Sequence, residues 1–441
     1  MPNPILPLWE YIPDGEPRVF GDRVYLYGSH DRAACDVFCD FKLKVWSASV
    51  DDLNNWTCHG DSFKTRSSGD RKPDTPWTDH ELFAPDVIEK DGKYYLYAYI
   101  VGSKGAVGVS DRPEGPFELL SGYKYDTIVG DDGIFNDAGV LVDDDGKVYI
   151  YYGFTESNMN ELDPANMYEI KAGSYKRPVI DDTENVPQEQ RFFEASSPRK
   201  INGKYYMIYS PCVGSRLAYA TSDSPRGPFI YRGYIIDNGV DYPSGNNHGS
   251  VCCIKGQWYV FYHRMTNSTI MSRRACVEKI EILPDGTIPT VEMTSLGFED
   301  SLDPYKLTPA EIACVLKGGC FVTEKDIFTR TVTDITNGCI IGYKYFDFCI
   351  DFTNDGMTIA LKIKGGGAKC RVRVLLDDPE NGEEIGSVQI GTGDGVYTAK
   401  TAKVIGRHAL YFVAEHGVEG WTAQYFEGRK LFELEEFVFM K

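Results

Sequence analysis

The clearest pattern along the chain is a hydrophobic hairpin that occurs five times. Each copy has a short strand, a tight turn with a glycine, and a second strand in which aromatic and aliphatic residues dominate. The turns and second strands occupy residues 21–27, 91–97, 145–151, 202–210 and 255–262. Glycine-containing two-residue turns between such strands predict antiparallel β-hairpins.

The repeat extends beyond these hairpins. The segment 107–117, which ends in Gly-Pro-Phe, resembles the segment 219–229, which ends in the same way. Repetition of whole β-sheet units at a spacing of roughly 50 to 70 residues is typical of a propeller, in which one sheet forms each blade. We therefore expect an all-β protein with a five-bladed β-propeller over residues 1–296.

The pattern changes after the fifth hairpin. A polar, turn-forming stretch at 297–305 predicts a linker. Beyond it, alternation of apolar and polar residues, for example over 357–364 and 370–377, is typical of half-buried strands. Residues 306–441 are therefore expected to form a β-sandwich. Within the propeller, the insertion 62–82 predicts a loop over one face, in which Trp77 either lines a substrate site or packs the loop in place.

An ionisable residue precedes the turn glycine of every hairpin at a similar distance. These residues are Asp14, Asp86, Asp137, Glu194 and His248. In a propeller the equivalent ends of the innermost strands converge, so we expect these side chains to meet near one mouth of the central channel.

Composition narrows the class of partner. The formal net charge is −19 and no basic cluster offsets it, which argues against nucleic acid. No apolar run is long enough for a membrane span, and the first residues do not read as a signal peptide. The 12 cysteines lack CxxC spacing, which predicts reduced thiols in the cytoplasm. Cys35 and Cys39 near His30 allow a metal cluster, but buried small side chains are the simpler interpretation.

Three acids at one mouth suit the hydrolysis of a glycosidic bond, which requires a carboxylic acid and a carboxylate on opposite faces of the sugar. Apolar neighbours of Glu194 should raise its pKa, as a general acid requires. Asp14, in a polar turn, should stay ionised and activate water as a general base. Asp137 would be a third charge that keeps Glu194 protonated. Any one of these acids could instead be a strand-end residue, and Asp86 could simply anchor its blade through hydrogen bonds.

The motifs that carry these acids resemble those of glycoside hydrolase family 43. The similar segments are Pro13-Asp14, residues 136–146 and residues 193–198. The family's usual Asp-Pro is Asp14-Gly15 and Asp137-Ala138 here, and its usual Glu-Gly-Pro is Glu194-Ala195-Ser196. The resemblance implies an inverting five-bladed propeller enzyme in which Asp14 is the base, Asp137 the pKa modulator and Glu194 the acid.

The same resemblance implies two further roles. The family often holds a calcium ion on the propeller axis near a histidine, and His248 matches that position; the alternative is a histidine hydrogen-bonded in the channel. Arg273 matches an arginine that contacts the sugar, whereas Arg274 should face elsewhere because neighbouring strand residues alternate. We also expect Trp77 and Asp86 among the substrate-binding residues.

The C-terminal region resembles a family 6 carbohydrate-binding module in the segments 355–357, 382–388 and 406–412. Trp421 and Tyr425 could stack on sugar there, or the domain could only pack against the propeller.

Together these features predict an inverting, exo-acting α-L-arabinofuranosidase that removes arabinose from arabinoxylan or arabinan oligosaccharides. A β-xylosidase is the alternative, because the two sugars present similar hydroxyl patterns. A sugar-binding propeller without catalysis is the alternative from another class.

Overall fold

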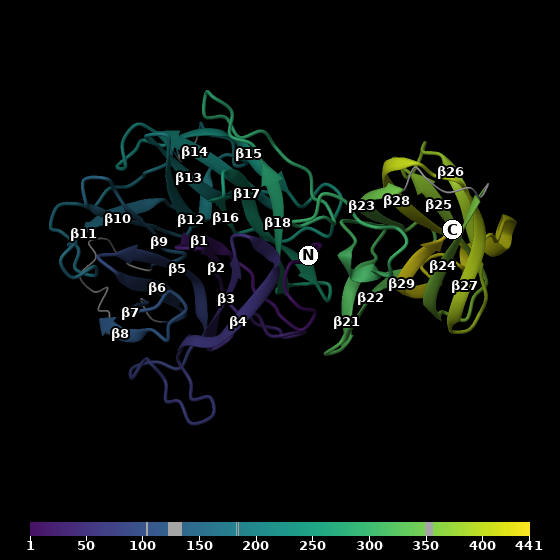
Figure 1. Cartoon of the computed structure of the whole chain (residues 1–441), viewed down its shortest axis with the longest axis horizontal. Coiled ribbons are helices and arrows are strands. Elements are labelled where there is room, and N and C mark those ends of the chain that lie inside the picture. Colours follow the sequence, from purple (N-terminus) through teal and green to yellow (C-terminus); the bar gives the residue numbers. More distant parts are fainter. Residues whose placement is uncertain (103–104, 122–134, 182, 184, 349–355) are drawn as a thin grey trace.

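The computed structural model describes residues 1–102, 105–121, 135–181, 183, 185–348 and 356–441, and within them the chain is almost entirely β-structure. The prediction of an all-β protein is confirmed. Five antiparallel sheets of three or four strands follow one another along the chain, and two larger sheets complete the described part (Figure 1).

The strands of the five small sheets follow the sequence repeat. They are β1 (Glu16–Phe20), β2 (Arg23–Tyr27), β3 (Lys42–Ser49) and β4 (Asp52–Lys64); β5 (Leu82–Lys90), β6 (Lys93–Ile100), β7 (Ala106–Ser110) and β8 (Glu118–Ser121); β9 (Gly139–Val142), β10 (Val148–Tyr152) and β11 (Asn158–Leu162); β12 (Phe192–Ile201), β13 (Lys204–Pro211), β14 (Arg216–Ser222) and β15 (Ile230–Asp237); and β16 (Ser250–Ile254), β17 (Gln257–Thr266) and β18 (Thr269–Ile280).

The five predicted hairpins are confirmed as the first two strands of each small sheet. Three of their turns have both central residues at positive φ, as in Asn202 (51°) and Gly203 (79°). Type I′ turns require this conformation, and their twist matches that of the strands they join. The turn chemistry in the sequence therefore sets the register of each hairpin.

The first strands of the small sheets lie against one another. Strand β1 contacts β5 and β16, and β9 contacts β5 and β12. Gly15, just before β1, forms a parallel bridge with Gly249, just before β16, which joins the first sheet to the fifth. Buried apolar clusters fill the spaces between neighbouring sheets, for example Val24 and Leu26 of the first sheet with Val277 of the fifth. The entrances to the five first strands are thereby brought to one region.

Paired charges occupy the space between these first strands. Arg18 of β1 binds Asp86 of β5 at 2.7 Å, and Arg199 of β12 binds Glu16 of β1. The amide of Val140 in β9 donates to Asp86 at 2.8 Å. Because buried charges are tolerated only when they are paired and hydrogen-bonded, these contacts tie four of the five sheets together.

The remaining strands form two larger sheets. Their elements are β19 (Thr308–Pro309), the 3-10 helix η2 (Ala310–Ile312), β20 (Val315–Lys317), β21 (Phe321–Asp326), β22 (Thr329–Ile335), β23 (Ile340–Phe348), β24 (Gly356–Gly365), β25 (Cys370–Leu376), β26 (Glu384–Ile390), β27 (Gly395–Ala402), β28 (Gly406–Glu415), the 3-10 helix η3 (Gly420–Tyr425) and β29 (Phe432–Met440). One sheet has the order β21-β22-β29-β24-β27, with β19 beside β29, and the other β20-β23-β28-β25-β26. The rings of Phe412 and Phe437, one from each sheet, lie 4.9 Å apart and share one buried cluster.

Polar contacts join the two parts of the molecule, with the N-terminus between them (Figure 1). Arg274 of β18 binds Glu311 of η2 at 2.6 Å, and Tyr11 donates to Glu324 of β21 at 2.7 Å. Arg274 thus points away from its neighbour Arg273, as strand alternation predicted. No helix within the described residues has the length and apolar character that crossing a membrane requires.

Candidate active site

The backbone has a positive φ angle just before or near the start of four of the first strands. Asp14, Ala84, Asp137 and Ala195 have φ angles of 57°, 29°, 50° and 71°. Non-glycine residues adopt positive φ only when the surrounding structure holds them there, and such positions are enriched at functional sites. Two of these residues, Asp14 and Asp137, carry a carboxylate, and a third, Ala195, directly follows Glu194.

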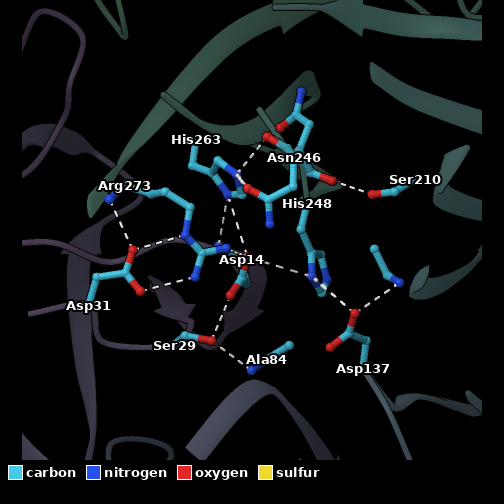
Figure 2. Close-up of polar contacts among 12 residues, drawn as sticks. Asp14, Ser29, Asp31, Ala84, Asp137, Ser210, Asn246, His248, His263 and Arg273 are labelled. Carbon is cyan, nitrogen blue, oxygen red and sulfur yellow. Dashed lines mark hydrogen bonds and ion pairs between the residues drawn. The ribbon is translucent and has the colours of Figure 1, made fainter. Parts of the chain in front are cut away.

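Asp14 is buried, and its carboxylate is held on two sides (Figure 2). The hydroxyl of Ser29 donates to Oδ2 at 2.6 Å, and Nη1 of Arg273 donates to Oδ1 at 2.8 Å. The same hydroxyl of Ser29 accepts the amide of Ala84 at 2.7 Å. The orientation of Asp14 is therefore fixed by contacts from other strands and loops.

Arg273 is positioned by a second acid. Its Nε and Nη2 bind the two oxygens of Asp31 at 2.9 and 3.0 Å, and its own amide donates to Asp31 Oδ2. A bidentate pair of this kind fixes the plane of the guanidinium. Only Nη1 is directed at Asp14, so Asp31 positions the group that stabilises the Asp14 carboxylate.

The pKa of Asp14 lies below its usual range. Burial alone would raise it, but the positive charge of Arg273, with a smaller contribution from the hydrogen bond of the Ser29 hydroxyl, outweighs burial. Asp14 is therefore ionised at neutral pH, as the sequence predicted. The reason differs, because the prediction relied on a polar turn and the structure shows a buried acid beside an arginine.

Asp137 lies next to both other acids. The amide of Ala195 donates to its Oδ2 at 3.1 Å, and Nδ1 of His248 lies 3.7 Å from this oxygen and 3.7 Å from Asp14 Oδ1 (Figure 2). Burial, followed by the charges of Glu194 and Asp14, raises the pKa of Asp137 well above its usual range. Asp14, Asp137 and His248, three of the five residues expected to converge, therefore lie in one cluster. Asp137 also contacts the backbone of Ala195, directly after Glu194, which is the fourth.

Glu194 lies at the edge of this cluster and lines a pocket of about 350 Å³ with Phe193, Ser210 and Asn246 among its walls. Burial raises the pKa of Glu194 to about 7, and the charge of Asp14 adds to this effect while Arg273 opposes it. The carboxyl is therefore substantially protonated near neutral pH. The sequence analysis gave this role to Asp137, whose own pKa is raised by burial and in turn by the charge of Glu194, and Asp14 contributes as well.

Two histidines complete the cluster in the neutral form. Burial lowers the pKa of His248 to about 4 and that of His263 to about 3. His263 accepts the amide of Asp14 on Nδ1 at 3.3 Å, and its Nε2 lies 3.1 Å from the carbonyl of Asn246. These contacts fix the tautomer with the proton on Nε2. His263 was not recognised in the sequence, although a histidine at the end of the apolar strand 259–262 was the available signal.

Asp86 does not join the cluster. Its carboxylate is bound by Arg18 through Nε and Nη2 and by the amide of Val140. The position that matches the bend at Asp14 is occupied by Ala84, so Asp86 lies further along its strand, beside Glu16. The expectation that all five residues meet is wrong for Asp86, and these contacts support the structural alternative over substrate binding.

The remaining predicted residues lie elsewhere. Trp77 is 39% exposed in the segment between β4 and β5, so both interpretations of it stay open. Trp421 and Tyr425 on η3 are 75% and 68% exposed, with their rings 6.0 Å apart. Asp355, in the segment that resembles a carbohydrate-binding module, lies outside the described residues.

The described residues around His248 fit a calcium site poorly. Calcium prefers six to eight oxygen ligands. Here the oxygens of Asp14 are engaged by Arg273 and Ser29, and those of Asp86 by Arg18. No group of three or more histidine, cysteine or acidic side chains suited to a metal occurs in the part of the chain that the structure describes. His30 binds Glu10 and Asp40, which removes it from any cluster with Cys35 and Cys39.

Comparison with known protein families gives one decisive match. The family described as "Glycosyl hydrolases family 43" matches residues 1–288, about two thirds of the chain. The chain belongs to glycoside hydrolase family 43. It is accordingly a glycoside hydrolase, which confirms both the resemblance seen in the sequence and the prediction of an enzyme.

Individual relatives within family 43 are consistent with this assignment. A xylosidase/arabinosidase of Thermoclostridium stercorarium is 35% identical, and the alignment covers 93% of this chain and 95% of that protein. A solved family 43 β-xylosidase/α-arabinofuranosidase from a compost metagenome, in complex with xylotriose, is 29% identical with a TM-score of 0.55 and covers 66% of this chain and 99% of its own.

A third similarity extends over the whole chain. An arabinoxylan arabinofuranohydrolase of Bacillus subtilis, solved with cellotetraose, has a TM-score of 0.56 at 24% identity and covers 100% of this chain and 97% of its own. At this identity the likeness concerns the fold, and it includes the two larger C-terminal sheets. The resemblance of that region to a family 6 carbohydrate-binding module stays a prediction.

Proposed function

We propose that this family 43 enzyme is an inverting, exo-acting α-L-arabinofuranosidase that removes arabinose from arabinoxylan or arabinan oligosaccharides. The observation that carries the proposal is the separation of pKa values within one cluster. Asp14 is held ionised by Arg273, while burial and Asp14 hold Glu194 protonated near neutral pH. Two carboxyl groups with opposite protonation states are what an acid and base pair at a glycosidic bond requires.

In this mechanism Glu194 protonates the glycosidic oxygen as the bond to the leaving group breaks. Asp14 accepts a proton from the water that attacks the anomeric carbon from the opposite face. Asp137 holds the Ala195 amide and so positions Glu194. Arg273 keeps Asp14 ionised and correctly oriented. The side chains of this cluster are at most 8% exposed, which suits a site that accepts a single terminal sugar. They are those of Asp14, Asp137, His248 and Arg273.

A β-xylosidase is the second candidate. Two of the similar proteins carry names that combine xylosidase with arabinosidase or arabinofuranosidase activity. The same acid and base serve both sugars, so the preference depends on contacts with the sugar hydroxyls.

We further propose that residues 1–296 form a five-bladed propeller, that 297–305 is the linker, and that 306–441 is a β-sandwich resembling a carbohydrate-binding module. The contacts among β1, β5, β9, β12 and β16 and the bridge between Gly15 and Gly249 support the first part. The shared apolar cluster between the two larger sheets supports the last.

Hydrolysis of paired nitrophenyl α-L-arabinofuranosides and β-D-xylosides, with the first-formed anomer followed by NMR, tests the function. The proposal predicts faster hydrolysis of the arabinofuranoside and inversion at the anomeric carbon. Faster hydrolysis of the xyloside would favour the second candidate. A protein that binds arabinosylated or unbranched xylo-oligosaccharides and hydrolyses none would be a binding propeller, and retention of configuration would contradict the mechanism.

A further inference from the structure

His30 lies between two acids that come from different segments of the chain. Its Nε2 is 2.9 Å from Oε1 of Glu10, and its Nδ1 is 3.0 Å from Oδ2 of Asp40. The side chain of His30 is 12% exposed, and those of Glu10 and Asp40 are 0% and 14% exposed. Buried charges are stable only when they are paired, so these contacts fix all three side chains. We call His30, Glu10 and Asp40 the histidine clamp.

The geometry requires His30 to carry a proton on each ring nitrogen. An ionised carboxylate only accepts hydrogen bonds, and a neutral imidazole has a proton on one nitrogen only. Two carboxylates that face the two ring nitrogens are therefore both satisfied only by the imidazolium. Burial would lower the pKa of His30, but the hydrogen bonds to Asp40 and Glu10 outweigh burial and raise it above its ordinary value.

The two acids of the histidine clamp stay ionised. Burial would raise the pKa of both carboxyl groups, but the hydrogen bond to His30 and smaller contributions outweigh it and lower both pKa values. One contribution comes from Lys44 of β3, whose Nζ lies 3.1 Å from Oε2 of Glu10, and another from the charge of Lys42, which acts on Asp40. Lys44 opposes the protonation of His30 without reversing it.

His30 separates the two residues that hold the ion pair of the active site. On one side of it, Ser29 donates to the carboxylate of Asp14 at 2.6 Å. On the other side, Asp31 binds Arg273 through both of its oxygens (Figure 2). The positions of Ser29 and Asp31 therefore depend on where the backbone of His30 is held.

Glu10 joins this loop to the segment that carries the proposed base. It precedes Tyr11, whose carbonyl accepts the amide of Asp31 at 2.9 Å, and the same segment continues to Asp14. The contact between Glu10 and His30 is therefore a second connection, made by side chains, between the loop and the segment of the base.

Asp40 joins the loop to a third segment. It follows Cys39, whose sulfur accepts a hydrogen bond from Arg273 at 3.6 Å. His30 therefore connects three separate stretches of the chain, each of which contains or contacts a member of the active-site ion pair.

We propose that His30, as an imidazolium, is a positioning residue for the general base Asp14. The histidine clamp holds the two neighbours of His30 in the places from which they orient Asp14 and Arg273. This inference rests on the proposed role of Asp14 as the base. Loss of one ring proton at high pH leaves a carboxylate facing a lone pair, which weakens the histidine clamp and slows hydrolysis.

NMR of the histidine ring nitrogens tests the protonation state independently of activity. In the wild-type protein both ring nitrogens of His30 should be protonated at neutral pH, and the loss of the signal in His30→Gln assigns it. A single protonated nitrogen would overturn the inference, whether or not the protein hydrolyses a glycoside. A wild type with both nitrogens protonated that hydrolyses no glycoside would instead contradict the proposed function, and with it the role of the histidine clamp in catalysis.

Kinetics test the effect on the base. The dinitrophenyl glycoside of the released sugar is the substrate, because its leaving group needs no proton from Glu194. His30→Gln should lower kcat roughly 10- to 100-fold and leave KM nearly unchanged, because a displaced base affects the transition state. Glu10 keeps its contacts with Lys44 and Trp46 in this variant, which preserves the fold. An unchanged kcat, or a rise in KM alone, would overturn the inference.

A second variant separates positioning from a merely structural role. Asp40→Asn keeps the ring of His30 but removes one of its two anionic partners, so the pKa of His30 falls. The basic limb of the pH profile of kcat/KM on the same substrate should then move to lower pH, however far the rate at the optimum falls. His408→Gln is the matched control, because His408 of β28 also pairs with a carboxylate, that of Asp377 at 2.7 Å. It should leave the limb in place, and an unmoved limb in Asp40→Asn would overturn the inference.

Discussion

Arg273 donates a hydrogen bond to Asp14 at 2.8 Å, and the side chains of both are at most 5% exposed. An isolated buried carboxylate would become protonated rather than stay charged. The guanidinium, itself held by Asp31, reverses that tendency. The contact with Arg273 therefore explains how Asp14 can stay ionised as the base while Glu194, the acid of the same cluster, is protonated.

Replacing Arg273 should impair the base. In Arg273→Gln the pKa of Asp14 rises, so the acidic limb of the pH profile of kcat/KM moves to higher pH, and the rate at the optimum falls roughly 100-fold. Arg273→Lys should keep the limb closer to that of the wild type, because it retains the charge and loses only the bidentate geometry. Arg232→Gln, at an exposed arginine, is the control. An acidic limb that does not move in Arg273→Gln would contradict the assignment.

Glu194 should make stability depend on pH. Its pKa in the folded protein is raised to about 7 from an ordinary value of 4.5, so the folded state binds the proton more tightly. Its stabilising contribution is present at low pH and is lost as pH rises from about 4.5 through about 7. Glu194→Gln should therefore stabilise the protein by about 1–3 kcal/mol at pH 8 and have little effect at pH 4.

Urea unfolding at both pH values measures this difference. Glu380→Gln, at an exposed glutamate, should show no such dependence. A Glu194→Gln variant that is equally stable relative to the wild type at pH 4 and pH 8 would show that the pKa of Glu194 is not raised.

Asp86 should matter for stability and not for substrate affinity. Asp86→Asn removes the closest ionic partner of the buried Arg18, which then keeps only Glu16 at 3.5 Å, and this should cost up to about 3–5 kcal/mol. At a temperature where the variant stays folded, KM should equal that of the wild type. Asp237→Asn breaks the more exposed pair with Arg216 and should cost about 1 kcal/mol or less. A raised KM with unchanged unfolding free energy would instead place Asp86 at the substrate.

Calcium removal should leave the enzyme unchanged. The carboxylates of Asp86, Glu16 and Asp14, which could otherwise bind calcium, are engaged by Arg18, Arg199 and Arg273. Dialysis against a chelator should therefore alter neither kcat/KM nor the unfolding temperature. A loss of activity that calcium restores would show that the region around His248 rearranges to bind the ion.

The hairpins were predictable because their signal is local. Glycine at the turn and apolar residues in the second strand specify a hairpin wherever it lies in the fold, and the repeat predicted that Asp14, Asp137 and His248 would meet. Asp86 was misplaced because a small shift along a strand gives a side chain different neighbours, here Arg18 and the Val140 amide. Asp31 and Ser29 lie in the loop after β2, outside the repeat. Their contacts depend on tertiary packing against β18 and β5, which no local pattern records.

The most direct test of the acid and base assignment varies the leaving group. Glu194→Ala should reduce kcat/KM for an oligosaccharide roughly 1,000-fold, because the departing oxygen needs a proton, yet spare the dinitrophenyl glycoside, whose leaving group needs none. Asp14→Ala should reduce both by similar factors, because the attacking water needs its base in each case. Equal losses on both substrates in Glu194→Ala would contradict the account.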